Sequence, residues 1–148
     1  MTFVNECEKS FGSLILKYNL KALILDSEEV IFKNKTTGLR VVYEKKESAI
    51  FVQIGRLVAC EFPKYKSVHE YDNDLKNRFD INFLIELRSS KSVASSLFNS
   101  SMRKTLDNYA SAIDKYASDV LEGDFSVFPK LTKLVKANIE QLKQDGLL

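Results

Sequence analysis

A single histidine, His69, is the only imidazole in the sequence, and it limits the chemistry that the chain can perform. Histidine-rich zinc sites, the HExxH metal motif and acid–base pairs of two histidines all need more than one imidazole. Glu70, Asp72 and Asp74 lie nearby, so His69 could act with one of these carboxylates. Such catalysis also needs a nucleophile or an anion-stabilising group, and the surrounding sequence offers neither.

Other cofactor motifs are also missing. Asp72 and Asp74 could begin an EF-hand calcium loop, but that loop needs Gly at its sixth position and Glu at its twelfth. The sequence has Asn77 and Phe83 at these positions. The five glycines lie far apart and form no phosphate-binding or nucleophile-elbow motif. We therefore expect a protein without catalytic residues, metal or cofactor.

The two cysteines, Cys7 and Cys60, form no CxxC pair, and we interpret both as small core residues. Cysteines without a disulfide framework are typical of a reducing compartment. The N-terminal segment is too polar and acidic for a secretory signal, and the apolar runs are too short for a membrane helix. These features predict a cytoplasmic protein with no membrane partner.

The charged side chains are nearly balanced, with 22 basic and 20 acidic residues and a net charge of +2. Binding to nucleic-acid phosphates usually needs a basic stripe. Here lysines alternate with acidic residues, as on a solvated surface. Lys133, Lys136 and Lys143 are an example, because Glu140 and Asp145 interrupt them. We expect no nucleic-acid partner.

Apolar spacing predicts a helix and then an antiparallel sheet. The helix, residues 3–18, ends at Asn19. Its apolar stripe consists of Phe3, Cys7, Phe11, Leu14 and Tyr18. Strands rich in branched and aromatic residues are expected at Leu20–Leu25, Glu29–Phe32, Leu39–Tyr43 and Ala49–Val58. Loops at 34–38 and 44–48 connect them, and Gly55 is expected to mark a bulge or bend.

Residues 61–80 form the least regular stretch, and a polar loop of this length is more often functional than idle. It mixes aromatic residues with both signs of charge, which is typical of protein-binding hot spots. The alternative is a disordered tether between two halves of the fold. We predict the following partner-binding residues: Tyr65, His69, Glu70, Tyr71, Asp72, Asp74 and Arg78.

Helical spacing returns after Asp80, a good N-cap for a helix over Ile81–Arg88. A serine-rich connection, 89–101, leads to a helix that ends at Glu122-Gly123. Ser126 is expected to cap the last helix. The buried face of that helix consists of Phe128, Leu131, Val135, Ile139 and Leu142.

The order of these elements predicts one α+β domain over residues 1–148. It has an N-terminal helix, an antiparallel sheet of three to four strands, and C-terminal helices packed on the sheet.

Three segments follow a familiar order of elements. FGSLILKYNLKAL (Phe11–Leu23) is a helix leading into a strand, and the Leu39–Ile54 hairpin supplies middle strands. YASDVLEGDFSVFPKL (Tyr116–Leu131) is a helix, a Gly-Asp-Phe-Ser turn and a last helix. Together they resemble the single-domain immunity proteins encoded beside polymorphic or contact-dependent growth inhibition toxins. The matched segments are mainly structural, so no binding residue is transferred.

The resemblance implies a cytoplasmic, non-enzymatic protein that neutralises a cognate toxin by forming a complex with it. Many immunity proteins against basic nucleases are strongly acidic, whereas this chain is slightly basic. Either its toxin is not a basic nuclease, or recognition uses a local acidic patch such as Glu70, Asp72 and Asp74. We expect a monomer or a weak homodimer.

Two alternatives remain open. The first is a structural or regulatory interaction module without a toxin, for example a homodimer that uses a sheet edge. The second is a small hydrolase that uses carboxylates and lysine around Glu44, Glu47, His69 and Asp72.

Overall fold

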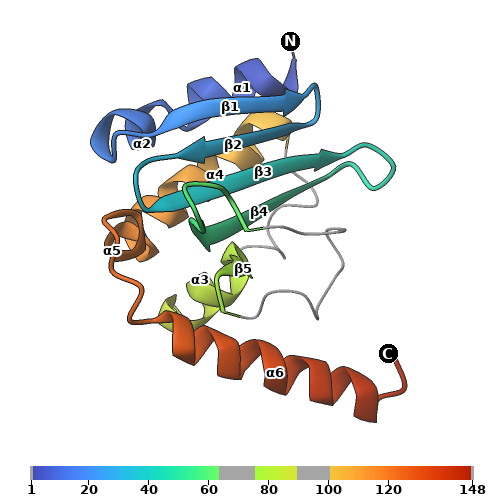
Figure 1. The fold of residues 1–148 in the computed structure, drawn as a ribbon. Helices are drawn as coiled ribbons and strands as arrows, with labels where there is room; N and C mark the ends of the chain where they lie inside the picture. The colour runs from blue at the N-terminus through green and yellow to red at the C-terminus, as the bar shows by residue number, and fades with distance from the viewer. Residues whose placement is uncertain (1, 64–75, 90–100, 148) are drawn as a thin grey trace.

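The computed structural model describes residues 2–63, 76–89 and 101–147, whose arrangement is shown in Figure 1. The strands are β1 (Lys21–Asp26), β2 (Glu29–Lys33), β3 (Thr37–Glu44), β4 (Ala49–Arg56) and β5 (Arg78–Asp80). The helices are α1 (Phe3–Ser10), α2 (Gly12–Lys17), α3 (Ile81–Ser89), α4 (Met102–Tyr116), α5 (Ser118–Leu121) and α6 (Phe128–Gln144). A helical start, then strands, then helices confirms the predicted α+β class.

The described strands form one five-stranded antiparallel sheet in the order β1-β2-β3-β4-β5. The sequence predicts three to four strands. The additional strand, β5, ends the stretch 61–80 that is predicted to be irregular, and it pairs with β4 through Ile54↔Phe79 and its neighbours. A strand of three residues is too short for its alternation of polar and apolar residues to be recognised in sequence.

One face of the sheet carries the hydrophobic core, and α1 and α4 lie behind this face in Figure 1. The cross-strand partners Val30, Val41 and Val52 are fully buried on it. Leu106 and Ile113 of α4 pack into the same core. The opposite face points toward the viewer, and no described helix crosses it.

The predicted N-terminal helix is divided in two at Phe11, whose backbone (φ −94°, ψ 5°) leaves the helical geometry. Gly12 follows the break, and glycine is a poor helix former. The predicted apolar stripe is nevertheless buried along its whole length, from Phe3 to Tyr18. Asn19 has a positive φ of 55°, as expected for the residue that ends a helix.

The C-terminal helices follow the predicted order with three differences, the first being that the helix expected to end at Glu122-Gly123 is divided at Ala117 into α4 and α5. Asp80 begins α3 as expected, because its carboxylate accepts a hydrogen bond from the Asn82 amide at 2.8 Å. Ser126 does not cap α6: its amide donates to the Asp124 carboxylate at 3.0 Å, and the helix begins after Val127. Ile139 and Leu142 are only partly buried, since the buried residues of α6 lie in its first half.

The turn between β2 and β3 is tied to helices from both ends of the chain. The Asn34 side-chain amide donates to the carbonyls of Tyr18 at 3.1 Å and Leu121 at 2.9 Å. The Thr37 hydroxyl donates to the Val120 carbonyl at 2.7 Å. These bonds satisfy carbonyls at helix ends and fix the sheet against α2 and α5.

Among the described residues, no helix is both long and apolar enough to cross a membrane.

Candidate protein-binding face of the sheet

Most of the predicted partner-binding residues lie outside the described part of the chain. They are Tyr65, His69, Glu70, Tyr71, Asp72 and Asp74. Arg78 is described: it stands in β5 opposite Gly55 and is 6% exposed. Its neighbour Phe79 belongs to the core, so the alternation of a strand directs Arg78 to the face without helices.

This face is formed by the side chains that alternate with the core residues of β1 to β4, and we call it the open face. Its members are Lys21, Leu23, Glu29, Ile31, Lys33, Arg40, Val42, Glu44, Phe51 and Gln53. Ile31, Arg40 and Gln53 are direct cross-strand partners at its centre. All three are buried, although Ile31 lies outside the main core cluster. The open face is therefore a second packed surface with a polar centre.

A buried ion pair occupies that centre. The Arg40 Nε donates to the Glu29 carboxylate at 2.6 Å, with side-chain exposures of 4% and 17%. The Arg40 Nη1 also donates to the Gln53 side-chain oxygen at 3.0 Å. These bonds hold the planar guanidinium across three neighbouring strands. The pair and the Gln53 side chain thus connect β2, β3 and β4 on this face.

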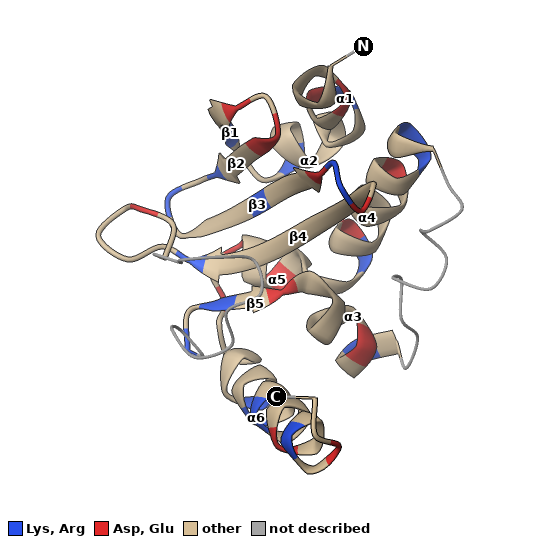
Figure 2. Cartoon of the chain, turned by 90° about the vertical axis from the view of Figure 1, so that its right-hand side faces the viewer, with Lys and Arg blue, Asp and Glu red and all other residues tan. Residues whose placement is uncertain are grey.

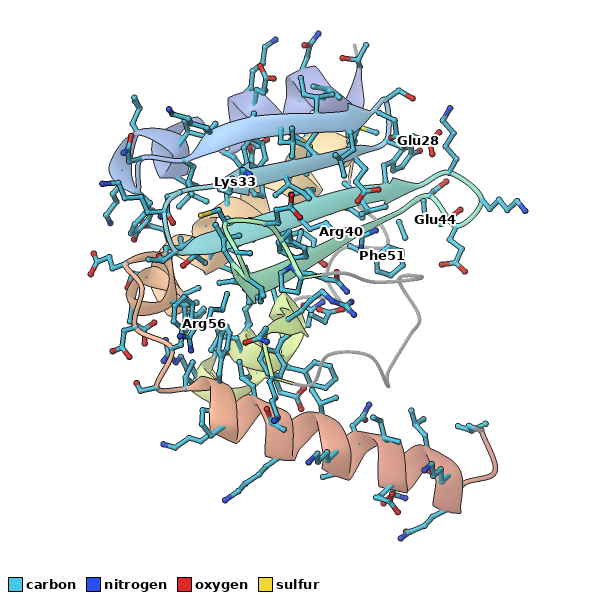
Figure 3. The ribbon with its side chains drawn as sticks, in the orientation of Figure 1. Glu28, Lys33, Arg40, Glu44, Phe51 and Arg56 are labelled. Carbon is cyan, nitrogen blue, oxygen red and sulfur yellow. The ribbon has the colours of Figure 1, made fainter. Side chains whose placement is uncertain are left out.

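Charges of opposite sign gather at the two ends of the open face (Figure 3). Glu44 lies at one end, and Glu28 stands in the adjoining turn beside Lys45. Lys21 and Lys33 lie at the other end, where they are direct cross-strand partners. A partner with the reverse order of charges would be oriented by this gradient.

The segment 57–63 folds over the basic end of the open face, where it crosses in front of β3 and β4 in Figure 1. A Cβ added at Gly38 would lie 2.7 Å from the Phe62 ring, and one added at Gly55 would lie 2.9 Å from it. The register through Gly55 is unbroken, so the bulge or bend predicted there is wrong. Gly55 is required because the Phe62 ring packs against its backbone.

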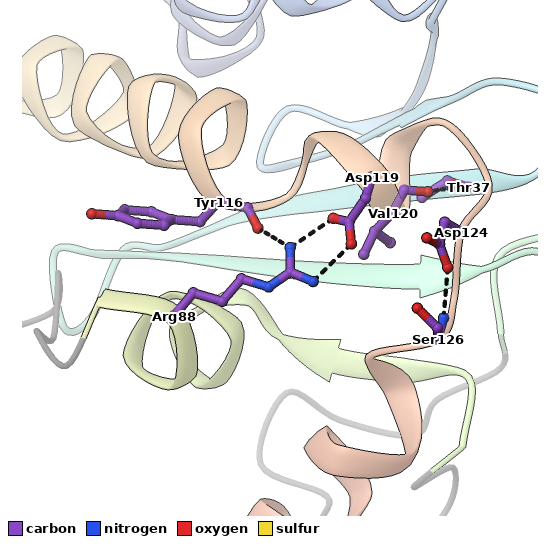
Figure 4. A network of polar contacts seen from close by, with 7 residues as sticks. All are labelled: Thr37, Arg88, Tyr116, Asp119, Val120, Asp124 and Ser126. Atoms are coloured by element: carbon purple, nitrogen blue, oxygen red, sulfur yellow. Dashed lines mark hydrogen bonds and ion pairs between the residues drawn. The ribbon is translucent and has the colours of Figure 1, made fainter.

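A second polar cluster joins the helices and is shown in Figure 4. The two terminal nitrogens of Arg88 donate to the two carboxylate oxygens of Asp119 at 2.6 and 2.7 Å. One of them also donates to the Tyr116 carbonyl at 2.6 Å. Hydrogen bonding to Arg88 lowers the pKa of the Asp119 carboxyl. This cluster links α3 to α5 and to the end of α4, which is a structural role.

A shallow pocket of about 290 Å³ lies beside this cluster, between α3 and the start of α6. It is lined by Leu87, Arg88, Ser126, Val127 and Lys130. The Arg88 charge is already matched by Asp119, so only Ser126 and Lys130 could contact a ligand through polar groups. This pocket therefore does not compete with the open face as the candidate site.

The groups with the most strongly raised pKa values among the described residues are buried. Burial raises the pKa of the Cys7 thiol to about 12 and that of the Tyr109 hydroxyl to about 12. Burial also raises the pKa of the Asp80 carboxyl, against the hydrogen bonds from Asn82 that lower it.

Cys7 is in the core as predicted, whereas Cys60 is exposed, so the predicted core position of Cys60 is wrong. Cys60 lies in the exposed turn after β4, beyond the core face of the sheet.

Within the described residues, no group of three or more His, Cys, Asp or Glu side chains is arranged to hold a metal ion. Comparisons of the chain with protein-family models, with curated proteins and with solved structures find no match. A functional proposal therefore rests on the geometry of the chain itself.

The centre of the open face is absent from the predicted binding residues, although the sequence carries a signal for it. Arg40 stands between Leu39 and Val41, and Gln53 stands between Val52 and Ile54. A single polar residue inside an apolar strand points to the face opposite the core. Two such residues in adjacent strands of a hairpin indicate that they meet.

Proposed function

We propose that the chain is a non-enzymatic immunity protein that neutralises a cognate bacterial toxin, and that the open face is its main recognition surface. The observation that carries the proposal is the make-up of this face: a buried Arg40–Glu29–Gln53 centre between ends of opposite charge. A rigid centre with a charged rim suits protein recognition, because the fixed centre holds the rim in place and the rim charges speed association.

The acidic end of the open face offers a local patch for a basic toxin. Glu28 and Glu44 lie at the same end of the sheet, where the β1–β2 and β3–β4 turns meet. Lys45 approaches Glu28 at 3.0 Å, so this end is not wholly acidic. The predicted acidic residues Glu70, Asp72 and Asp74 stay a second proposal for the same role.

Arg78 links the two proposed surfaces. It ends the segment in which the other partner-binding residues are predicted, and it lies in β5 at the border of the open face. Being 6% exposed, it supports the surface instead of offering an accessible hot spot. We therefore assign the direct contacts to the exposed rim and to the partly buried Phe51.

The hydrolase alternative gains no support from the described residues. The Glu44 carboxylate accepts a hydrogen bond from the Lys46 amide at 3.4 Å within its own turn, and Glu47 is exposed in that turn. His69 and Asp72 lie outside the described residues. One carboxylate at the end of β3 and one in the following turn, without a placed base or metal, do not form a reaction centre.

Growth rescue tests the proposal. The C-terminal domain of the protein encoded immediately upstream is expressed with the wild-type chain, with Glu44→Lys or with Lys130→Glu. We expect killing by that domain alone, rescue by the wild type, loss of rescue with Glu44→Lys, and full rescue with Lys130→Glu, which changes an exposed charge on α6. Killing that the wild-type chain does not prevent would refute immunity to that domain. Equal rescue by both variants would refute the role of the open face.

A further inference from the structure

The outer edge of β1 is exposed along its whole length. All six residues, Lys21 to Asp26, are exposed, and β2 is the only described strand that pairs with β1. Leu23, Ile24 and Leu25 are 44%, 53% and 45% exposed. An edge strand with apolar side chains on both faces is a template for pairing with another strand, because no described strand pairs with its backbone groups on that side.

The usual devices that block edge pairing protect only one end of this strand. The pairing with β2 shifts register between Ile24 and Asp26, and such a bulge twists an edge away from partners. From Lys21 to Ile24 the register is regular, and no proline or inward-pointing charge interrupts it. A short, regular and apolar segment is thus left open.

The two ends of the β1 edge carry opposite charges. When the β1 strands of two copies are antiparallel, the basic end of each strand therefore faces the acidic end of the other. The strand begins at Lys21, beside Lys33 of β2. It ends at the β1–β2 turn, which contains Asp26, Ser27 and Glu28. Figure 2 shows acidic residues at this turn. Antiparallel pairing places the basic start of each strand against the acidic turn of the other, whereas parallel pairing would place like charges together.

We propose that β1 pairs with β1 of a second copy of this chain, so that one antiparallel sheet continues across a two-fold axis near Leu23 and Ile24. The axis is perpendicular to the sheet, because antiparallel strands in one sheet keep each face on the same side. Aliphatic side chains of the two copies then cover one another on both faces of the sheet. The open faces of both copies form one continuous surface. This inference needs no toxin.

The first test is the oligomeric state of the purified chain, followed by analytical ultracentrifugation over a wide range of concentrations. We expect a reversible monomer–dimer equilibrium, because a single short strand pair forms a small interface. Leu23→Lys should weaken the dimer by about tenfold or more, since a buried ammonium group opposes pairing. The matched control is Leu147→Lys, which changes a residue that is 68% exposed far along the chain. A monomer at every concentration would overturn the proposal and leave the edge to a different protein.

A charge exchange tests the direction of pairing. Lys21→Glu should weaken the dimer, and so should Glu28→Lys. The double variant should restore it, because the two exchanged side chains again meet with opposite charges, each from a different copy. Absence of rescue, with circular dichroism showing all three variants folded, would contradict the antiparallel arrangement.

Cross-linking locates the axis. Cys60 is exposed, so Cys60→Ser removes the background thiol, while Cys7 stays buried. Single cysteines are then introduced at positions 22, 23 and 24. A residue on the axis lies within disulfide range of itself in the other copy, so one of the three variants should form a disulfide-linked dimer far faster than Leu147→Cys. Equal rates of disulfide formation at positions 22, 23, 24 and 147 would overturn the proposal.

Discussion

Two arginine–carboxylate pairs lie in different parts of the molecule, and they differ in their access to water. Arg40 and Glu29 join neighbouring strands on the open face, and their side chains are 4% and 17% exposed. Arg88 and Asp119 join α3 to α5 and stay partly exposed. Both pairs are short and well aligned. The hydrogen-bond geometry of the two pairs is therefore similar, and what differs is the exposure of their side chains to water.

This difference in exposure predicts which pair can lose one partner with the smaller loss of stability. If one partner of the exposed pair is lost, water can solvate the other. If one partner of the buried pair is lost, water reaches the other less readily, and the loss of free energy is larger. The Arg88–Asp119 pair therefore adds modestly to the stability of the helix packing. The Arg40–Glu29 pair stabilises the sheet only when both partners are present. A partner that binds the open face would meet a rigid surface.

The largest expected effect is that of Glu29→Ala. It removes the Glu29 carboxylate from the buried Arg40 guanidinium, so we expect the free energy of unfolding to fall by about 3–5 kcal/mol. Urea unfolding at neutral pH, followed by circular dichroism, measures this change. The matched control is Glu28→Ala, which removes the neighbouring carboxylate that pairs with Lys45 at the surface.

The double variant Glu29→Leu with Arg40→Met separates charge from packing. If the penalty comes from the unpaired charge, removing both charges recovers most of the stability that the single variant loses. A double variant as unstable as Glu29→Ala would show that the stability depends on the shape of these side chains and not on their charges. The explanation of the two ion pairs by their solvent exposure would then be wrong.

Arg88→Ala should have a smaller effect, because Asp119 can be solvated once its partner is removed. We expect a loss of about 1–2 kcal/mol in the free energy of unfolding. The loss includes the hydrogen bond to the Tyr116 carbonyl. A loss as large as that of Glu29→Ala, measured in the same urea experiment, would contradict the role of solvent access.

This pair also predicts a pH dependence with a definite sign. The folded-state pKa of Asp119 lies below its ordinary value of 3.8 because Arg88 donates hydrogen bonds to it. The stability from the pair is therefore fully present above pH 3.8 and is lost as the pH falls through the lowered value. The difference in stability between the wild type and Arg88→Ala should shrink in that acid range.

The main elements of the fold could be predicted from the sequence wherever a long pattern repeats. The stripe from Phe3 to Tyr18 is buried as predicted, and the predicted strand ranges overlap β1 to β4. The break at Phe11 and the strand β5 could not be predicted, because each depends on tertiary packing over a few residues. The predicted core position of Cys60 is wrong because its strand ends earlier than the predicted Val58.

Much less of the candidate site could be predicted, because it is assembled from four strands. The predicted binding residues come from one polar segment, where the composition is unusual. The pairing of Arg40 with Glu29 and Gln53 depends instead on the register of β2, β3 and β4. Register follows from turn lengths, which the sequence defines only approximately. A polar residue inside each apolar strand is the signal that leads to the open face.

The smallest expected effect is that of Lys17→Met, which removes a third ion pair and sharpens the comparison. Lys17 Nζ lies 2.9 Å from the Asp114 carboxylate and links α2 to α4, with side-chain exposures of 58% and 46%. Hydrogen bonding to Lys17 lowers the pKa of Asp114, but water competes for both groups. Asp114 also keeps the hydrogen bond from the Tyr18 hydroxyl at 3.0 Å. We therefore expect the urea midpoint to stay within experimental error of the wild type. A midpoint shift comparable to that of Arg88→Ala would mean that linking distant helices matters more than burial, and the order of the three pairs would have to be explained by topology.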